Sequence, residues 1–208
     1  MTEQQSLGDW RGVSLDIAAM DGVAADVDLS FACMFDHELD GGLRGGLAHL
    51  NNVLSGRLVQ LRDDGVFLGY PMETLLIRQP PPAIAARAVM VIGMGAPTEW
   101  TAEVTARAVD TAIRAATQLG ANSAAFAPSL LDSGLAAHAT AGVAQQMMRA
   151  VVRAIDAQIS IAAHDLAPAP SLRRWVFDVG AAGFAAATAQ FLAALVELKS
   201  GAGSGGES

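Results

Sequence analysis

Short apolar runs alternate along the chain with longer stretches that have helical periodicity. Runs rich in Val, Ile, Phe and Met are typical of strands, and the run at residues 88–92, Ala-Val-Met-Val-Ile, contains no polar residue. A strand of this kind is buried on both faces, as in a parallel sheet covered by helices. The pattern predicts strands over residues 13–17, 27–35, 66–68, 74–78, 88–92, 122–127 and 175–179.

Apolar residues recur three or four positions apart in four longer stretches, as they do on one face of a helix. The stretch 39–54 repeats leucine in this way, although its four glycines each weaken a helix by about 1 kcal/mol relative to alanine. A second helix is predicted at residues 98–119, with Thr98 as its N-cap, and a last one at 183–198. The stretch 135–161 repeats apolar residues every four positions, at Val143, Met147, Val151, Ile155 and Ile159.

The alternation of strands with helices favours an α/β fold of three layers, in which helices cover both faces of a mostly parallel or mixed central sheet. The strands predicted at 66–68 and 74–78 follow each other closely and suggest a hairpin. We expect a single domain over residues 13–199, preceded by a polar N-terminal extension at 1–12. Residues 200–208, rich in Gly and Ser, are expected to form a disordered tail.

Composition excludes several classes of function. The 208 residues are 52% hydrophobic, carry a net charge of −8 and contain 13 scattered Lys and Arg, which disfavours nucleic-acid binding. One cysteine permits neither an intrachain disulfide nor a thiolate metal cluster, and no secretory signal is recognisable, so a cytoplasmic location is expected. Residues 179–196 lack charge, but eight alanines and two glycines favour a buried helix over a membrane span.

Three segments carry a resemblance to a known family. They are residues 38–43, Glu-Leu-Asp-Gly-Gly-Leu; residues 65–69, with a Phe-Leu-Gly turn; and residues 85–95, an apolar strand that ends in Gly-x-Gly. With the order of elements, they make residues 13–198 resemble the N-terminal domain of the leucyl (cytosol) aminopeptidase family. The resemblance implies a macro-domain-like α/β fold.

The resemblance also shapes the functional expectation. Members of the family carry two metal ions and the peptidase residues in a separate C-terminal domain, before which this sequence ends. We therefore expect no catalytic residues, metal or cofactor here, and a non-catalytic, stand-alone homologue that acts in assembly or regulation, possibly of a separate peptidase subunit. Because the family forms hexamers and the chain is unusually apolar, a homo-oligomer is expected.

A Gly-x-x-Gly loop between a predicted strand and a helix is the best candidate for a ligand site. Its residues are Gly180, Ala181, Ala182, Gly183 and Phe184. Backbone N–H groups in such a loop can face an anion, and in macro domains a similar loop holds the diphosphate of ADP-ribose. The alternative function is therefore a module that binds ADP-ribose or another nucleotide or phosphate ligand. Close packing of the helix explains the small residues equally well, and Asp178 opposes an anion.

Other motifs have simpler explanations. The acidic segment Asp36-His37-Glu38-x-Asp40 has poor spacing for a metal and is interpreted as a solvated loop. Gly93-x-Gly95 lacks the third glycine of a dinucleotide fingerprint and predicts a structural turn. Cys33, in a predicted buried strand, is expected to be inert. The remaining candidates have no partner in a recognisable catalytic motif: Ser133, His138, His49 and His164.

Overall fold

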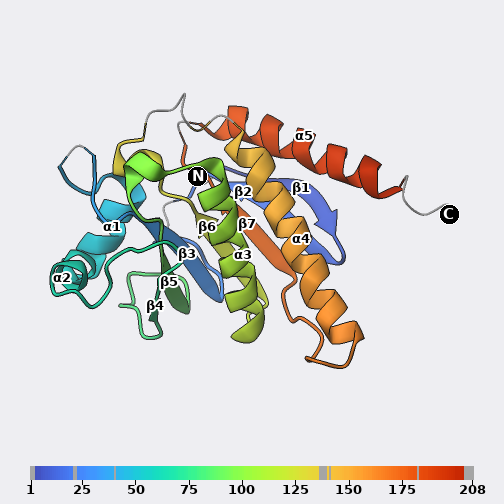
Figure 1. Ribbon diagram of the computed structural model, residues 1–208, viewed down its shortest axis with the longest axis horizontal. Coiled ribbons are helices and arrows are strands. Elements are labelled where there is room, and N and C mark those ends of the chain that lie inside the picture. Colours follow the sequence, from blue (N-terminus) through green and yellow to red (C-terminus); the bar gives the residue numbers. More distant parts are fainter. Residues whose placement is uncertain are drawn as a thin grey trace.

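The computed structural model describes residues 3–20, 23–39, 41–135, 140, 142–181 and 183–203. In these residues seven strands form one sheet, in the order β1-β2-β7-β6-β3-β5-β4 (Figure 1). The strands are β1 Gln4–Trp10, β2 Val13–Ala18, β3 Leu29–Met34, β4 Thr74–Ile77, β5 Ala88–Gly93, β6 Ser123–Ala127 and β7 Arg174–Asp178. The helices are α1 Gly45–Val53, α2 Arg57–Asp63, α3 Ala102–Gln118, α4 Val143–Ala163 and α5 Phe184–Gly203, with short 3-10 turns at Pro97–Glu99 and Leu131–Ser133.

The sheet is mixed. Strands β2, β7, β6, β3 and β5 run parallel to one another, and β1 and β4 pair antiparallel with β2 and β5 at the two edges. Helices α3, α4 and α5 cover one face, while α1 and α2 cover the other (Figure 1). The predicted three-layer α/β fold is confirmed. No helix of the described ranges has the length and apolar character that crossing a bilayer requires.

The central strands are apolar on both sides because each side faces a separate core. In β3, Phe31 and Cys33 belong to the core beneath α3, α4 and α5, and Ala32 and Met34 to the core beneath α1 and α2. Side chains alternate between the faces of a strand. A strand buried on both faces therefore shows a continuous apolar run instead of an alternating one.

Five aromatic rings form a chain through the larger core. Trp175 lies 6.1 Å from Phe31, 5.9 Å from Phe126 and 6.1 Å from Phe177, measured between ring centroids, and Phe177 stacks on Phe191 at 4.3 Å. The indole N–H of Trp175 is buried and has no hydrogen-bond partner among the residues that the structure describes. Rings at these separations stabilise each other by about 0.5–1.5 kcal/mol per pair beyond the area they bury.

The sheet begins earlier and the last helix ends later than predicted. Residues 4–10, expected in an extension outside the domain, form the edge strand β1, whose Leu7 is buried. The indole N–H of Trp10 donates to Asp156 on α4 over 3.0 Å, which fixes the end of this strand. Helix α5 continues to Gly203, so the tail predicted from residue 200 is helical over its first residues. Residues 204–208 lie outside the described ranges.

The prediction that residues 66–68 and 74–78 form a hairpin is wrong. Phe67 is buried in the core beneath α1 and α2, but its segment is a loop, and β4 pairs with β5 instead. The loop crosses the end of β5, where the N–H of Gly95 donates to the carbonyl of Gly69 over 2.8 Å. The short apolar run at 66–68 thus reflects burial of Phe67, not strand pairing.

Helix starts were also misplaced. Helix α1 begins at Gly45 rather than at residue 39, and Leu39 is exposed. Thr98 lies in a 3-10 turn, and the N-cap of α3 is Thr101. Helix α4 begins at Val143; its predicted earlier part includes residues 136–139 and 141, which lie outside the described ranges.

Glycine at position 93 is required by the close approach of the loop to β5. A Cβ at Gly93 would lie 2.1 Å from the carbonyl oxygen of Tyr70 and 2.6 Å from the carbonyl carbon of Gly69, both of them backbone atoms that cannot rotate away. We expect Gly93→Ala to lower the free energy of unfolding by about 1–3 kcal/mol or more, measured by urea denaturation. Gly201→Ala, in an open part of α5, is the control and should be neutral or stabilising by up to about 1 kcal/mol. Equal effects would contradict the steric explanation.

Candidate functional site

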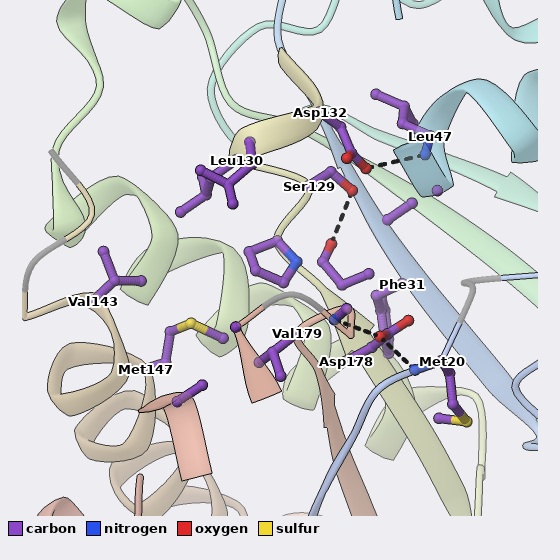
Figure 2. A pocket seen from close by; sticks show the side chains of 18 of the residues that line it. Met20, Phe31, Leu47, Ser129, Leu130, Asp132, Val143, Met147, Asp178 and Val179 are labelled. Carbon is purple, nitrogen blue, oxygen red and sulfur yellow. Dashed lines mark hydrogen bonds between the residues drawn. The ribbon is translucent and has the colours of Figure 1, made fainter. Parts of the chain in front are cut away.

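A cleft of about 380 Å³ opens at the carboxyl ends of the parallel strands (Figure 2). Its lining comes from β3, from the segments that follow β6 and β7, and from the facing ends of α1, α4 and α5. The chain passes from β3 to β5 in one direction and then from β5 back across β3 to β6. Ligand sites of open α/β sheets lie at the carboxyl edge where the strand order reverses in this way.

The cleft reaches both faces of the sheet. Val143 and Met147 on α4 lie on one side of it, and Leu47 on α1 lies on the other, together with Asp132 (Figure 2). Phe31 of β3 lies between them and connects the cleft to the aromatic rings of the larger core. Most of the lining is therefore apolar side chains held by rigid elements.

Asp178, the last residue of β7, is 6% exposed and lines the cleft. Its Oδ1 accepts a hydrogen bond from the N–H of Met20 over 3.1 Å and from the N–H of Gly180 over 3.3 Å. The carboxylate therefore joins the end of β2 to the start of the glycine loop. It also engages a backbone N–H that would otherwise be offered to an anion.

Asp132 performs a similar task at the N-terminus of α1. It lies in the 3-10 turn of the β6–α4 connection, and its Oδ2 accepts from the N–H of Leu47 over 3.2 Å. The N–H of Arg44 donates to the backbone carbonyl of Asp132, also over 3.2 Å. A negative charge here is favourable because the first N–H groups of a helix lack intrahelical partners and carry partial positive charge.

Glycine at position 45 permits this contact. A Cβ there would lie 2.0 Å from Oδ1 of Asp132, and the φ of Gly45 is +54°, in the left-handed region that side chains disfavour. Gly45 and Asp132 together fasten α1 to the β6–α4 connection. The two walls of the cleft are thereby tied to each other.

The other polar groups of the lining are hydroxyls and an amide. They belong to Ser30, Ser129, Thr140 and Gln190. Among the lining residues that the structure describes there is no Lys, Arg or His. The described lining therefore combines apolar walls with two carboxylates.

The cavity at the opposite end of the sheet has arginine side chains in its lining, unlike the described lining of the cleft. This cavity, of about 370 Å³ and at the amino ends of the strands, is lined by Arg78 and Arg87. Arg87 pairs with Asp28 over 3.0 Å, and Asp28 also accepts the N–H groups of Asn122 and Ser123 over 2.8 and 3.1 Å. Burial alone would raise the pKa of Asp28, but these amides and the guanidinium hold it below its ordinary value.

The predicted glycine loop does face the cleft. Gly180, Ala181 and Gly183 line it, while Phe184 is half-buried and packs against the larger core. Ala182 lies outside the described residues. Whether the loop binds an anion stays a prediction.

Sequence reasoning missed the contact of Asp132 with α1, because Asp132 and its partner Leu47 are 85 positions apart. The only signal in the sequence was an acidic residue soon after the end of a strand.

The acidic segment after β3 differs from its interpretation as a solvated loop. Glu38 accepts two hydrogen bonds from the Arg62 guanidinium, over 2.7 and 3.1 Å, and its side chain is only 9% exposed. The ion pair ties this segment to α2. His37 pairs with Asp36, and Asp40 lies outside the described residues. The described part of the chain brings together no group of three His, Cys, Asp or Glu that could hold a metal ion.

Two further predictions concern single residues. Cys33 is buried, and its burial raises the pKa of the thiol, which keeps it protonated at neutral pH. Gly93 and Gly95 form the predicted structural turn, held against the loop that contains Gly69. The side chain of Ser133 and all of His138 lie outside what the structure describes.

The fold is that of a macrodomain. The Oceanobacillus iheyensis macrodomain with ADP superposes with a TM-score of 0.64 at 11% identity, over 95% of this chain and 98% of that chain. A Trypanosoma brucei macrodomain gives a TM-score of 0.56 at 14% identity, over 85% and 65% of the two chains. A mutant of tomato leucine aminopeptidase gives 0.65 at 16% identity, over 89% of this chain and 36% of that chain. At these identities the likeness shows the fold alone.

The chain belongs to the cytosol aminopeptidase family, because the model of that family's N-terminal domain matches residues 36–157. The resemblance inferred from the sequence is thereby confirmed. The chain spans about a third of the tomato enzyme's length, the share being 36%. No curated protein matches the sequence.

The contact of Asp132 with α1 should contribute measurably to stability. Asp132→Ala removes the acceptor at the helix N-terminus, and we expect it to lower the free energy of unfolding by about 0.5–2 kcal/mol, the usual range for loss of a cap. Asp132→Asn keeps an oxygen acceptor and should lose less. Asp110→Ala, which breaks an exposed pair with Arg114 on α3, should cost only about 0.3–0.5 kcal/mol. Urea denaturation of the three variants makes the comparison; an Asp132→Ala effect no larger than that of Asp110→Ala would contradict it.

Proposed function

We propose that this chain is a non-catalytic member of the cytosol aminopeptidase family that acts in regulation or assembly by binding a small ligand in the cleft. The observation that carries the proposal is the cleft itself, which lies at the reversal point of the sheet and is lined by both helical layers. Its volume of about 380 Å³ is within the range of small-molecule sites, about 300–1,000 Å³.

The connections around the cleft support a regulatory role. Asp132 links α1 to the β6–α4 connection, and Asp178 links β2 to the loop before α5. A ligand that contacts these carboxylates contacts segments that lead into three helices. Ligand binding can shift a conformational equilibrium only through contacts that differ between the two states, and these links are where such contacts would be made.

The surface of α5 supports the assembly part of the proposal. From its start to Val196 the helix has no charged residue, and its exposed positions include Ala185, Ala189, Ala193 and Val196. Val196 is 63% exposed. An uncharged apolar helix face of this kind favours contact with another protein surface. A homo-oligomer and a separate peptidase subunit both stay predictions, as does a cytoplasmic location.

The non-catalytic part of the proposal is tested by peptidase assay. We expect the chain to leave leucine-p-nitroanilide unhydrolysed above the buffer rate, with or without added Mn²⁺ or Zn²⁺. Absorbance of the released nitroaniline is the measurement. Metal-dependent turnover that disappears when a chelator is added, and that elutes with the chain in size-exclusion chromatography, would refute the proposal.

A second candidate function is the binding of ADP-ribose or another nucleotide. It is favoured by one observation, that the glycine loop predicted to receive an anion lines the cleft of a fold shared with a macrodomain solved with ADP. Against it, Asp178 already accepts the N–H of Gly180, and the described lining offers no cation to a phosphate. The carboxylates therefore make this the weaker candidate.

Calorimetric titration with ADP-ribose distinguishes the two candidates. We expect no saturable heat up to millimolar ligand. Two variants of α5 make the result specific: Ala187→Trp fills the cleft, and Ala189→Trp places the same bulk on the exposed face of the helix. Saturable heat that survives Ala189→Trp and is lost in Ala187→Trp would establish the second candidate instead.

A further inference from the structure

The cavity at the amino ends of the parallel strands has no described lining residue in common with the cleft. We propose that this amino-end cavity is a second ligand site, which binds a carboxylate that carries an apolar group through Arg78 and Arg87. The site goes beyond the proposed function, because it lies at the other end of the strands and is built from other residues.

The described lining of the amino-end cavity has an excess of positive charge. Its charged residues are Arg78, Arg87 and Asp28, two cations against one anion, in a chain whose net charge is −8. Asp28 pairs with Arg87 over 3.0 Å. Arg78 is exposed and forms no ion pair or hydrogen bond with any residue that the structure describes. An anionic ligand would therefore compensate a cation that the described protein groups leave uncompensated.

Asp28 fixes the position of Arg87 without engaging all of its donors. Its Oδ1 pairs with Nη1 of Arg87, while its Oδ2 accepts the N–H groups of Asn122 and Ser123 over 2.8 and 3.1 Å. A guanidinium group has five N–H donors in a planar fork, and the side chain of Arg87 is 83% exposed. Donors therefore remain for a ligand carboxylate, which a guanidinium binds through two parallel hydrogen bonds.

The backbone around the amino-end cavity favours a carboxylate over a phosphate. Phosphate sites commonly present several free backbone N–H groups. Here the N–H groups of Gly120 and Ala121 donate to carbonyls of α3, and that of Asn122 donates to Asp28. The carboxyl end of α3 also carries partial negative charge, which opposes a dianion more strongly than a monoanion. Guanidinium groups are thus the cationic donors of the site, and they suit one carboxylate.

The apolar part of the lining sets the second half of the ligand class. Leu76 of β4 and Leu119, the C-cap of α3, both line the amino-end cavity. Leu119 is 40% exposed, so a ligand that covers it removes apolar surface from water, which favours binding in proportion to the area. The volume of about 370 Å³ is within the range of small-molecule sites, about 300–1,000 Å³.

Three matched probes test the ligand class. 3-Phenylpropionate carries a phenyl ring and a carboxylate, 3-phenylpropionamide is its neutral analogue of nearly the same shape, and 2-phenylethyl phosphate is predominantly a dianion at neutral pH. We expect 3-phenylpropionate to shift the backbone amide resonances of residues 76–78, 87–88 and 119–122 saturably in NMR titrations. The amide should bind at least about fivefold more weakly, because it lacks the charge. The phosphate should bind no more tightly than the carboxylate.

Variants assign the binding to the amino-end cavity. Arg78→Gln removes one guanidinium from an exposed position and should weaken 3-phenylpropionate binding by about fivefold or more, with little effect on the amide. Arg153→Gln removes the same charge from an exposed position of α4 outside the cavity and should leave affinity unchanged. Leu119→Ala reduces the apolar wall and should weaken both ligands alike. Circular dichroism checks that each variant is folded.

The outcomes are distinct from those for the cleft. Saturable binding of 3-phenylpropionate that is weakened in Arg78→Gln and retained in Arg153→Gln and Ala187→Trp supports the inference. Binding that is lost in Ala187→Trp places the probe in the cleft and overturns the inference. Equal affinity for the amide, tighter binding of the phosphate, unchanged affinity in Arg78→Gln, or no saturable shift at millimolar ligand overturns it as well. The proposed function stands in each of these cases, because the two sites share no described lining residue.

Discussion

Burial of both faces of the parallel strands is the constraint on which the structure depends. Strands β3 and β5 carry apolar residues on each side, so neither face of the sheet can be left to water. Two helical layers follow, and the chain must cross the sheet edge each time it passes from a strand to a helix. The crossings at the carboxyl ends leave the space that becomes the cleft. The cleft thus forms because helices cover both faces of the sheet. Its two carboxylates lie where strands lead into the connections to the helices.

The sequence pattern predicts the buried elements well and the peripheral ones poorly. Strand β5 is found because it is a continuous apolar run, and β3 and β7 because most of their residues are apolar, a strong signal for buried strands. Strand β1 was missed because an edge strand is mostly exposed and reads as polar. The loop containing Phe67 was mistaken for a strand because a run of three apolar residues resembles a short strand, although only Phe67 of the three is fully buried. The local pattern of apolar residues indicates which side chains are buried. Strand pairing depends instead on which distant segment of the chain lies beside the strand.

In the candidate site, too, local features could be predicted from the sequence and long-range contacts could not. The glycine loop after β7 was recognised because its spacing is local and follows a strand, and the structure places it on the cleft. The role of Asp132 could not be predicted, because its partner Leu47 belongs to a helix whose start was itself misplaced by the glycines before it. Glu38 was assigned to solvent for the same reason, since Arg62 lies in the unpredicted helix α2. Contacts between polar residues that are far apart in the chain produce no periodic pattern in the sequence.

The chain of aromatic rings has an optical consequence. Trp175 is fully buried and lies against Phe31, which lines the cleft, with the two rings tilted to each other. Its neighbour Phe177 stacks on Phe191, another lining residue. Within the described part of the chain, the indole N–H forms no hydrogen bond that would shift its emission toward the red. A molecule that displaces Phe31 alters the surroundings of this indole directly, and one that displaces Phe191 alters them through Phe177. The core therefore contains an intrinsic fluorophore placed to report occupancy of the cleft without any added label.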